Sequence, residues 1–276
     1  MSTNVRGAGE PACSPGVLCA WEELLMTNAK ALRSRLAAAA FLSASLLAPA
    51  SAALAKPAAV DSGGPRVEVT RRDVEMSNEK IAMAYSALVD MWTKDFRAIG
   101  EHFDPPRILR YTRGARTACG YIGPSNAQYC PDNNTILYDE VFVAGMGRIA
   151  ANALGTDGDM ASVGVIAHEM GHAVAMQLGH VSRSSYRNES TADCLAGAFT
   201  QQAGRDSSLE KGDIEEAFFG MSLAGDPTPE PTGNARYDAM IQARLARESH
   251  GTKEQRTENF RAGLVGGARA CLAEFR

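Results

Sequence analysis

The sequence has few aromatic residues, few histidines and no concentration of positive charge. Of its 276 residues, 7% are aromatic and five are histidine, and 28 Lys and Arg stand against 32 Asp and Glu, for a net charge of −4. Without a run of Lys or Arg there is no basic surface for a phosphate backbone, so we expect no nucleic-acid partner. Collagen, heptad and solenoid periodicities are also absent, which excludes fibrous and repeat folds. The remaining composition, 45% hydrophobic and 22% charged, is that of a globular protein.

The N-terminal residues have the pattern of an export signal rather than of a folded domain. Three basic residues precede an uncharged apolar run over 36–55, which ends in small residues. This order predicts a signal peptide over 26–55, with translation starting at Met26, so that residues 1–25 are not expected in the product. The alternative is an uncleaved membrane anchor, because about twenty apolar residues just span a bilayer. We therefore expect a periplasmic or secreted protein that contacts a membrane only if this anchor is retained.

The number of cysteines fits an oxidising compartment. A start at Met26 leaves four cysteines, at positions 119, 130, 194 and 271, and an even number suits disulfide formation. Four cysteines allow three pairings. Proximity favours Cys119 with Cys130, which flank one Gly- and Pro-containing loop, and leaves Cys194 with Cys271. Buried free thiols are the alternative.

The rest of the chain predicts one helix-rich α+β domain. Residues 56–75 contain Pro, Gly and charge without a buried face and are expected to be a linker, followed by the domain over 76–276. A helix is predicted over 77–99 and short strands over 107–112 and 135–138. Further helices are predicted over 140–154, 159–178, 189–203, 210–222, 234–247 and 252–264. The pattern leaves open whether the strand at 135–138 is an edge strand that could bind an extended substrate or an interior strand.

One of the predicted helices contains a metal-binding motif. Residues 168–172 read His-Glu-Met-Gly-His, within an apolar helical run. Histidines at positions i and i+4 project from one face of a helix, so His168 and His172 can both reach one Zn²⁺ at about 2.0–2.1 Å. Glu169 would then lie beside the metal without binding it, where it can take a proton from zinc-bound water.

A catalytic zinc needs a third protein ligand, and the next predicted helix offers one. Glu189 lies 189 − 172 = 17 residues after the second histidine, and Asp193 follows it at i+4. Glu189 is the predicted third ligand, and Asp193 is predicted to accept the N–H of a ligating histidine. The zinc proteases with a third histidine would require Gly at 175 and His at 178, but Ala175 and Leu178 stand there. That branch is excluded.

Together, HEMGH and the later NESTADCLAG resemble the gluzincin arrangement, and the chain is similar to the neutral zinc metallopeptidase family of bacteria. Further matching blocks stand at 117–120, 123–124, 129–131, 158–161, 192–197, 212–217 and 250–256. The resemblance runs from about Trp92 to Phe275 and implies a zincin-like fold. Two departures, at 125–128 and at Asn259, lie away from the expected zinc ligands.

A second catalytic residue is expected near the C-terminus. Peptide hydrolysis needs a donor for the developing oxyanion, and His250 is the candidate, within the block at 250–256. Thr252 and Gln255 also form a capping-box pattern, so the same stretch fits a simple helix start. Tyr138 and Tyr186 are weaker candidates for the donor.

These features predict an exported zinc-dependent metallopeptidase that acts on a peptide or protein substrate. His168, His172 and Glu189 would hold Zn²⁺, and Glu169 and His250 would be the catalytic residues. One alternative is an inactive, zinc-stabilised extracytoplasmic binding module, and another is a zinc amidohydrolase with a non-peptide substrate. An intact Glu169 argues against the inactive module, because structural zinc sites are closed by four protein ligands and need no base.

Overall fold

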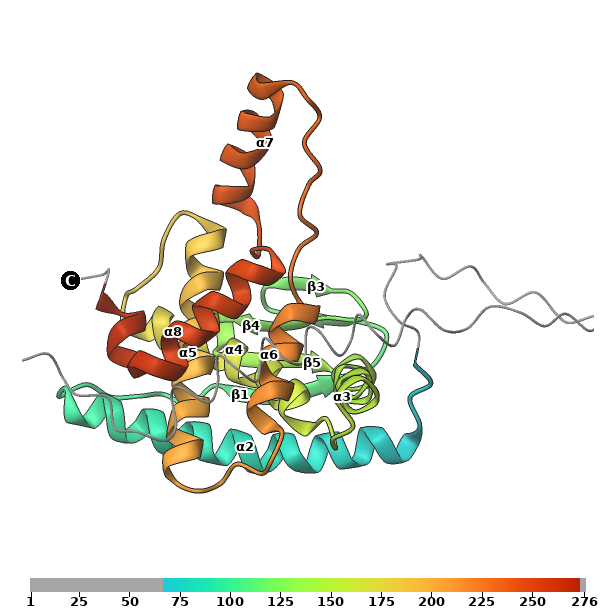
Figure 1. The fold of residues 1–276 in the computed structure, drawn as a ribbon. Coiled ribbons are helices and arrows are strands. Elements are labelled where there is room, and N and C mark those ends of the chain that lie inside the picture. Colours follow the sequence, from blue (N-terminus) through green and yellow to red (C-terminus); the bar gives the residue numbers. More distant parts are fainter. Residues whose placement is uncertain (1–66, 274–276) are drawn as a thin grey trace, which may run out of the picture. The chain divides into compact units, whose positions relative to one another are not determined.

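The computed structural model describes residues 67–273, and the expectations for residues 1–66 lie outside this part of the chain (Figure 1). The described helices are α2 (Arg71–Ala98), α3 (Glu140–Leu154), α4 (Asp159–Gln177), α5 (Ser185–Arg205), α6 (Asp213–Leu223), α7 (Ala235–Glu248) and α8 (Lys253–Cys271). The strands are β1 (Arg107–Tyr111), β2 (Ala115–Thr117), β3 (Gly120–Ile122), β4 (Ala127–Cys130) and β5 (Thr135–Asp139), with a short 3-10 turn at Pro131–Asn133. The predicted helix-dominated α+β fold with a small sheet is confirmed.

The long helix α2 begins earlier than the hydrophobic pattern predicted. Thr70 and Asp73 form a reciprocal capping box, which supplies partners for the free N–H groups of the first turn and starts α2 at Arg71. Residues 71–75 are therefore helical instead of linker. The apolar stripe of α2, which includes Leu88, Trp92 and Phe96, is buried in the core.

The main sheet has three strands in the order β1-β5-β4. The central strand, β5, is parallel to β1 and antiparallel to β4, and all five of its residues are buried. The strand predicted at 135–138 is thus the interior strand, and its apolar sequence reflects neighbours on both sides. The edge strand nearest the candidate site is β4. A separate hairpin is formed by β2 and β3.

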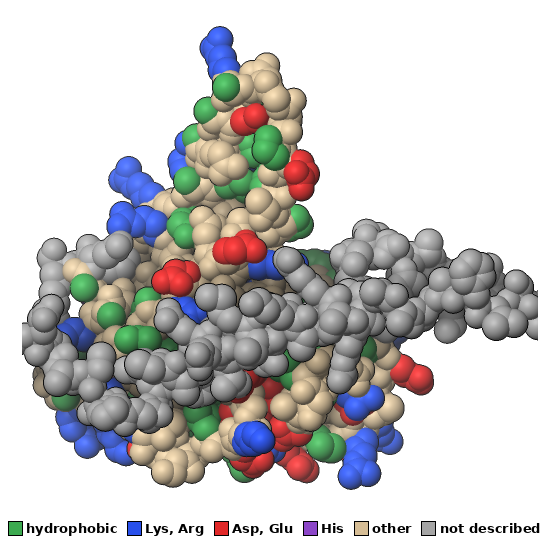
Figure 2. Space-filling view, viewed as in Figure 1, with side chains coloured by type: hydrophobic (Ala, Val, Ile, Leu, Met, Phe, Trp, Pro, Cys, Tyr) green, Lys and Arg blue, Asp and Glu red, His purple; other side chains and the backbone are tan. Residues whose placement is uncertain are grey.

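Helix α4 lies at the centre of the helical part of the domain. Most of its residues are buried, and it contacts α2, α3, α5 and α6. In contrast, α7 stands away from the rest of the described domain (Figure 1) and has no buried residue. Hydrophobic side chains are visible on this projecting helix in Figure 2, and Tyr237 and Met240 are its exposed large hydrophobic residues. No helix among residues 67–273 is both long enough and apolar enough to cross a membrane.

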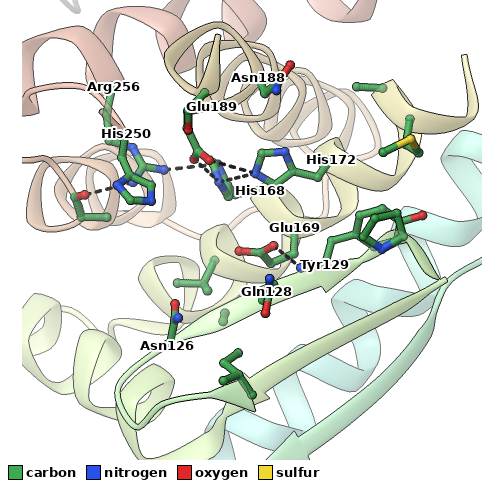
Figure 3. A pocket seen from close by; sticks show the side chains of 18 of the residues that line it. Asn126, Gln128, Tyr129, His168, Glu169, His172, Asn188, Glu189, His250 and Arg256 are labelled. Carbon is green, nitrogen blue, oxygen red and sulfur yellow. Dashed lines mark hydrogen bonds and ion pairs between the residues drawn. The ribbon is translucent and has the colours of Figure 1, made fainter. Parts of the chain in front are cut away.

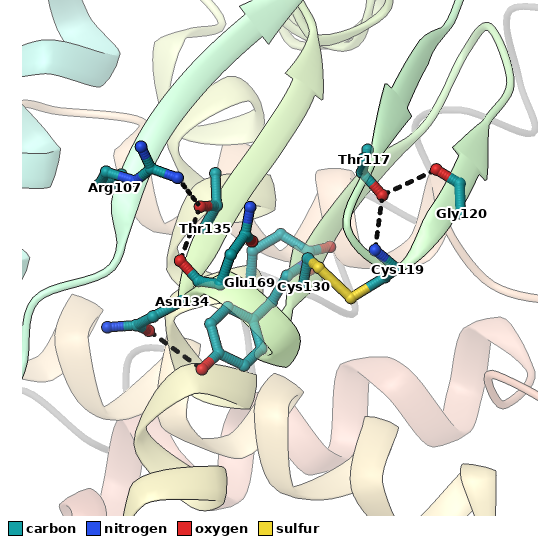
Figure 4. Close-up of a disulfide and its surroundings, with 10 residues drawn as sticks. Arg107, Thr117, Cys119, Gly120, Cys130, Asn134, Thr135 and Glu169 are labelled. Atoms are coloured by element: carbon teal, nitrogen blue, oxygen red, sulfur yellow. Dashed lines mark hydrogen bonds between the residues drawn. A yellow bond between two sulfur atoms is a disulfide. The ribbon is translucent and has the colours of Figure 1, made fainter.

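Both favoured cysteine pairings are confirmed, and the disulfides are consistent with an oxidising compartment. Cys119 bonds to Cys130 and ties the β2–β3 hairpin to the end of β4, beside a turn in which Thr117 accepts a hydrogen bond from the Cys119 amide (Figure 4). Cys194 bonds to Cys271 and joins α5 to α8. These two helices also approach closely where Gly197 faces Gly263. A Cβ atom built on Gly263 would lie only 1.7 Å from the carbonyl oxygen of Cys194, so the crossing requires glycine there.

Candidate metal centre and active-site cleft

Three side chains from two helices converge on one point. His168 and His172 extend from α4 and Glu189 extends from α5, as Figure 3 shows. The Nε2 atoms of the two histidines are 3.1 Å apart, and Glu189 places its carboxylate oxygens 3.1 Å from Nε2 of His168 and 3.6 Å from Nε2 of His172. Two ligands of a tetrahedral zinc, each at about 2.0–2.1 Å, would lie about 3.3 Å apart. The donor atoms therefore fit Zn²⁺ in both type and spacing.

The close crossing of α4 and α5 makes this convergence possible. Gly171 lies between Glu169 and His172 in sequence order and faces α5. A Cβ atom at this position would lie 2.8 Å from the carbonyl oxygen of Ala192. Any larger residue would push the two helices apart, and the carboxylate of Glu189 would move away from the histidines. The close packing of α4 against α5 thus explains why glycine stands inside the motif.

Without a metal, the three groups form a tightly coupled proton-sharing cluster. Burial disfavours a charged His168, but hydrogen bonds to Asp193 and Glu189 outweigh burial and raise the pKa of the imidazole to about 10. Burial also opposes ionisation of Glu189, yet its hydrogen bonds with His168 and His172 lower the pKa of this carboxyl well below its usual range. The cluster therefore pairs an ionised carboxylate with a protonated imidazole, and a bound cation would take the place of that proton.

Asp193 is completely buried behind His168. Its Oδ1 atom accepts a hydrogen bond from Nδ1 of His168 at 2.8 Å. With the proton on Nδ1, the lone pair of Nε2 points toward His172 and Glu189, which is the tautomer that a metal ligand needs. The geometry thus places Asp193 where the sequence expected it, as a hydrogen-bond partner of His168 outside the group of candidate donor atoms.

Glu169 faces the same cleft but stays outside the group of donor atoms (Figure 3). Its Oε2 atom accepts a hydrogen bond of 2.7 Å from the backbone amide of Tyr129, on the edge strand β4. No described residue donates a hydrogen bond to its other oxygen, Oε1. Sequence reasoning missed this contact, because a backbone amide has no residue-type signal and lies 40 residues away.

His250 lies between α7 and α8 and borders the cleft. Its backbone amide donates to Oδ2 of Asp226 at 2.8 Å, and its Nδ1 atom is 3.7 Å from Oδ1 of the same residue. The capping box of Thr252 and Gln255 is also present, which confirms the structural interpretation of this stretch, while the catalytic role of His250 stays a prediction. Asp226 was not anticipated from the sequence. It follows a helix end and carries no motif.

The two tyrosines proposed as weaker donors are not among the described residues that line the cleft. The hydroxyl of Tyr138 donates to Asn78 at 2.8 Å and is buried in the core. Tyr186 lies next to Gly251, where a Cβ atom would be 3.1 Å from its ring. His250 is therefore the remaining candidate of the three.

The cleft has a volume of about 670 Å³ and runs between the sheet edge and the helices. One part of its wall is apolar and includes Phe142, Met146, Val165 and Met221. The charged side chains among its described lining residues are Glu169, Glu189 and Arg256, apart from the histidines. Each of these three has a partner within the protein.

A second group of acids lies at the N-terminus of α4. Glu216 is fully buried, and its two oxygens accept hydrogen bonds from the amides of Gly158 and Met160, both at 2.9 Å. Burial, together with nearby acids, raises the pKa of Asp213 to about 6. Lys80 forms an ion pair of 2.5 Å with Asp159. The matching blocks at 158–161 and 212–217 thus anchor the start of the helix that carries both histidines.

Comparison with known proteins agrees with this arrangement. A family model described as "Putative neutral zinc metallopeptidase" matches residues 55–275. The chain is 32% identical over 216 residues to "Uncharacterized protein YpfJ" of Escherichia coli, covering 69% of this chain and 70% of that protein. It is 26% identical over 187 residues to "Uncharacterized protein Rv2575" of Mycobacterium tuberculosis, covering 59% of each. No solved structure matches. The chain belongs to the neutral zinc metallopeptidase family.

Proposed function

We propose that this protein is an exported zinc peptidase that hydrolyses peptide bonds inside peptide or protein substrates. The observation that carries the proposal is the convergence of His168, His172 and Glu189 at the spacing of zinc ligands. Glu169 faces the same cleft and is not part of the ligand group, which is the position of a general base.

The catalytic roles follow from the contacts of each side chain. When bound, Zn²⁺ would act as a Lewis acid, which polarises the substrate carbonyl and lowers the pKa of water to about 7. Glu169 takes a proton from the attacking water through Oε1 and later passes it to the leaving amine. The amide of Tyr129 holds Oε2, so the carboxylate keeps one orientation during both transfers.

His250 is the proposed donor to the oxyanion that develops on the substrate carbonyl. An imidazole whose Nδ1 side faces a carboxylate keeps a proton on Nδ1, so only its charged form also supplies the N–H of Nε2. Asp226 lies on that side, 3.7 Å from Nδ1. The side chain of His250 is 61% exposed, so it can reach a substrate that fills the cleft.

The edge strand and the charge of the cleft support an endopeptidase. β4 borders the cleft, and no described strand pairs with its side away from β5. An extended peptide can add there as a further strand, beside the Tyr129 amide that Glu169 already binds. An exopeptidase needs a charged group to bind the free terminus of its substrate. All charged side chains among the described lining residues already have protein partners. We therefore propose internal, uncharged segments as substrates, with an apolar side chain against Phe142 and Met221.

The disulfide at Cys194 argues against the alternative of an inactive, zinc-stabilised binding module. A structural zinc site is closed by four protein ligands, and a free Cys194, next to Asp193, would be a candidate for the fourth ligand here. Cys194 is bonded to Cys271 instead. Export is proposed from the two disulfides together with the sequence pattern at 26–55, and mass spectrometry of the mature N-terminus tests it.

The mechanism is tested by comparing two Glu-to-Gln variants. Zinc content and cleavage of a diverse peptide library are measured for the parent, for Glu169→Gln and for Glu189→Gln, with and without a chelator. Gln at position 169 can still accept the hydrogen bond from Tyr129 but cannot take a proton. We expect it to keep one equivalent of zinc and to lose about 10²–10⁴-fold in kcat.

Glu189→Gln is the matched control, because it should lose zinc together with activity. Turnover of Glu169→Gln within tenfold of the parent would remove Glu169 from the mechanism. If the parent cleaves a library of non-peptide amides and no peptide, the amidohydrolase alternative is correct.

A further inference from the structure

Arg256, in the first turn of α8, is a buried cation that the proposed catalytic steps do not use. Only 6% of its surface is exposed. Its Nε atom donates to both carboxylate oxygens of Asp193, at 3.2 and 3.1 Å, and its Nη2 atom donates to Oδ1 at 2.6 Å. Its Nη1 atom donates to the carbonyl oxygen of Ala224 at 2.9 Å. The guanidinium is thus held on two sides, by a carboxylate and by a backbone carbonyl.

Arg256 and His168 bind the same carboxylate oxygen. Oδ1 of Asp193 lies 2.8 Å from Nδ1 of His168 and 2.6 Å from Nη2 of Arg256. Nη2 itself lies 3.2 Å from Nδ1 of His168, and Arg256 and His250 are drawn on the same side of the ligand group in Figure 3. The orientation of Asp193 therefore depends on both neighbours, and any rotation of this carboxylate would turn the His168 ring.

The charge balance also requires Arg256. Asp193 has no exposed surface, and a buried carboxylate needs a compensating positive charge. A histidine that binds a metal through Nε2 is a neutral ring and supplies only one hydrogen bond from Nδ1. Among the described residues, Arg256 is then the full positive charge in contact with Asp193. Its planar guanidinium matches the two oxygens of the carboxylate, whereas the ammonium group of a Lys would not.

The tertiary structure holds Arg256 firmly in this place. The helix α8 packs backbone against backbone on α5 at Gly197 and Gly263. The Cys194–Cys271 disulfide joins the two helices at the residue that follows Asp193. The arginine and the carboxylate, 63 residues apart in sequence, are thus carried on two helices that cannot easily shift relative to each other.

We propose that Arg256 is a positioning residue of the zinc site, which fixes Asp193 and, through it, the imidazole of His168 in the orientation that a zinc ligand needs. The inference rests on the proposed function only in taking Zn²⁺ as the ligand of His168, His172 and Glu189. Arg256 touches neither the substrate nor the metal in this role. This positioning role would explain why the block at 250–256 ends in an arginine.

The test measures zinc affinity, by competition with a chromogenic chelator, in the full mature chain. Loss of a partner in the outer shell of a metal site typically weakens metal binding about 10–100-fold, and we expect this loss for Arg256→Gln. Arg256→Lys keeps the charge without the planar guanidinium and should fall between Gln and the parent. Arg269→Gln, an exposed position on the same helix, is the control and should stay within about twofold.

A double-mutant cycle with Asp193→Asn separates positioning from general stability. If Arg256 acts through Asp193, replacing it should weaken zinc binding less than about threefold once position 193 is Asn. Fully additive losses, or an Arg256→Gln variant that binds zinc as tightly as the parent, would overturn the proposal. If Arg256→Gln alone does not fold, the cycle is run with Arg256→Lys and judged in the same way.

Two further readouts distinguish the role from a structural one. The absorption spectrum of the Co²⁺-substituted protein reports the geometry of the ligands, and it should change in Arg256→Lys but not in Arg269→Gln. Thermal melting of the metal-free protein reports stability alone. A fall in melting temperature with an unchanged Co²⁺ spectrum and unchanged zinc affinity would refute the positioning role. A parent that binds no zinc would instead refute the proposed function.

Discussion

A methyl group added at Gly263 should destabilise the protein strongly, because two helices meet there at backbone distance. The built Cβ atom lies 1.7 Å from the carbonyl oxygen of Cys194 and 2.9 Å from the amide nitrogen of Ala198. On the facing helix, a Cβ atom at Gly197 would lie 2.0 Å from the carbonyl oxygen of Phe260. Ordinary contact begins at 3.4 Å, so Gly263→Ala requires a shift of 3.4 − 1.7 = 1.7 Å. Neither helix has a flexible side chain at this point that could move instead.

The magnitude follows from the cost of overpacking. Inserting a methyl group into a packed interior typically costs about 1–3 kcal/mol, and we expect about 3 kcal/mol because backbone atoms lie on both sides. For a domain of this size, that loss lowers the melting temperature by about 6–12 °C. Thermal denaturation of the metal-free protein, followed by circular dichroism, measures it. The shift also moves Arg256 from Asp193, so zinc binding by the folded variant should weaken too.

Gly204→Ala is the matched control for this prediction. Gly204 is also in α5, but a Cβ atom there would only meet the side chain of Leu209, at an ordinary 3.5 Å. Ala is favoured over Gly in helices by up to about 1 kcal/mol, so this variant should melt at or above the temperature of the parent. If Gly263→Ala and Gly204→Ala both melt within about 2 °C of the parent, the close crossing of α5 and α8 is wrong.

Three further predictions concern ionisable groups. Since the pKa of His168 is raised to about 10 in the metal-free protein, zinc uptake at pH 8 should release about one proton from this ring. Calorimetry in buffers of different ionisation heat measures the number of protons released. Zinc uptake without proton release would contradict the shared-proton cluster. Burial raises the pKa of Asp213 from 3.8 to about 6. The folded state therefore holds the proton more tightly than the unfolded state, and the stability of the fold decreases as the pH rises from 3.8 through 6. Asp213→Asn should therefore raise the free energy of unfolding by up to about 3 kcal/mol at pH 8 and leave it unchanged well below pH 3.8. Urea denaturation at both pH values measures the difference. His250→Ala and Asp226→Asn should each lower kcat by about 10–10²-fold with little change in KM; unchanged turnover in both variants would leave the loop before α8 with its capping role alone.

The sequence alone determined the local chemistry of the candidate site. His168 and His172, and likewise Glu189 and Asp193, are i and i+4 pairs, and helical geometry places such pairs on one face whatever the surroundings. The fold class and the family also followed from local patterns and motif blocks. Cys119 and Cys130 could be paired because only one loop separates them.

The tertiary structure decided what depends on contacts between distant segments. The central position of β5 required the strand order, since an apolar run of this length fits an interior strand or a covered edge equally well. The amide of Tyr129 reaches Glu169 across 40 residues and Arg256 reaches Asp193 across 63. Neither contact has a periodic or local signal, because each depends on how closely two packed elements approach. The sequence could thus name the groups whose donor atoms suit a cation, whereas only packing showed which groups hold those residues in place.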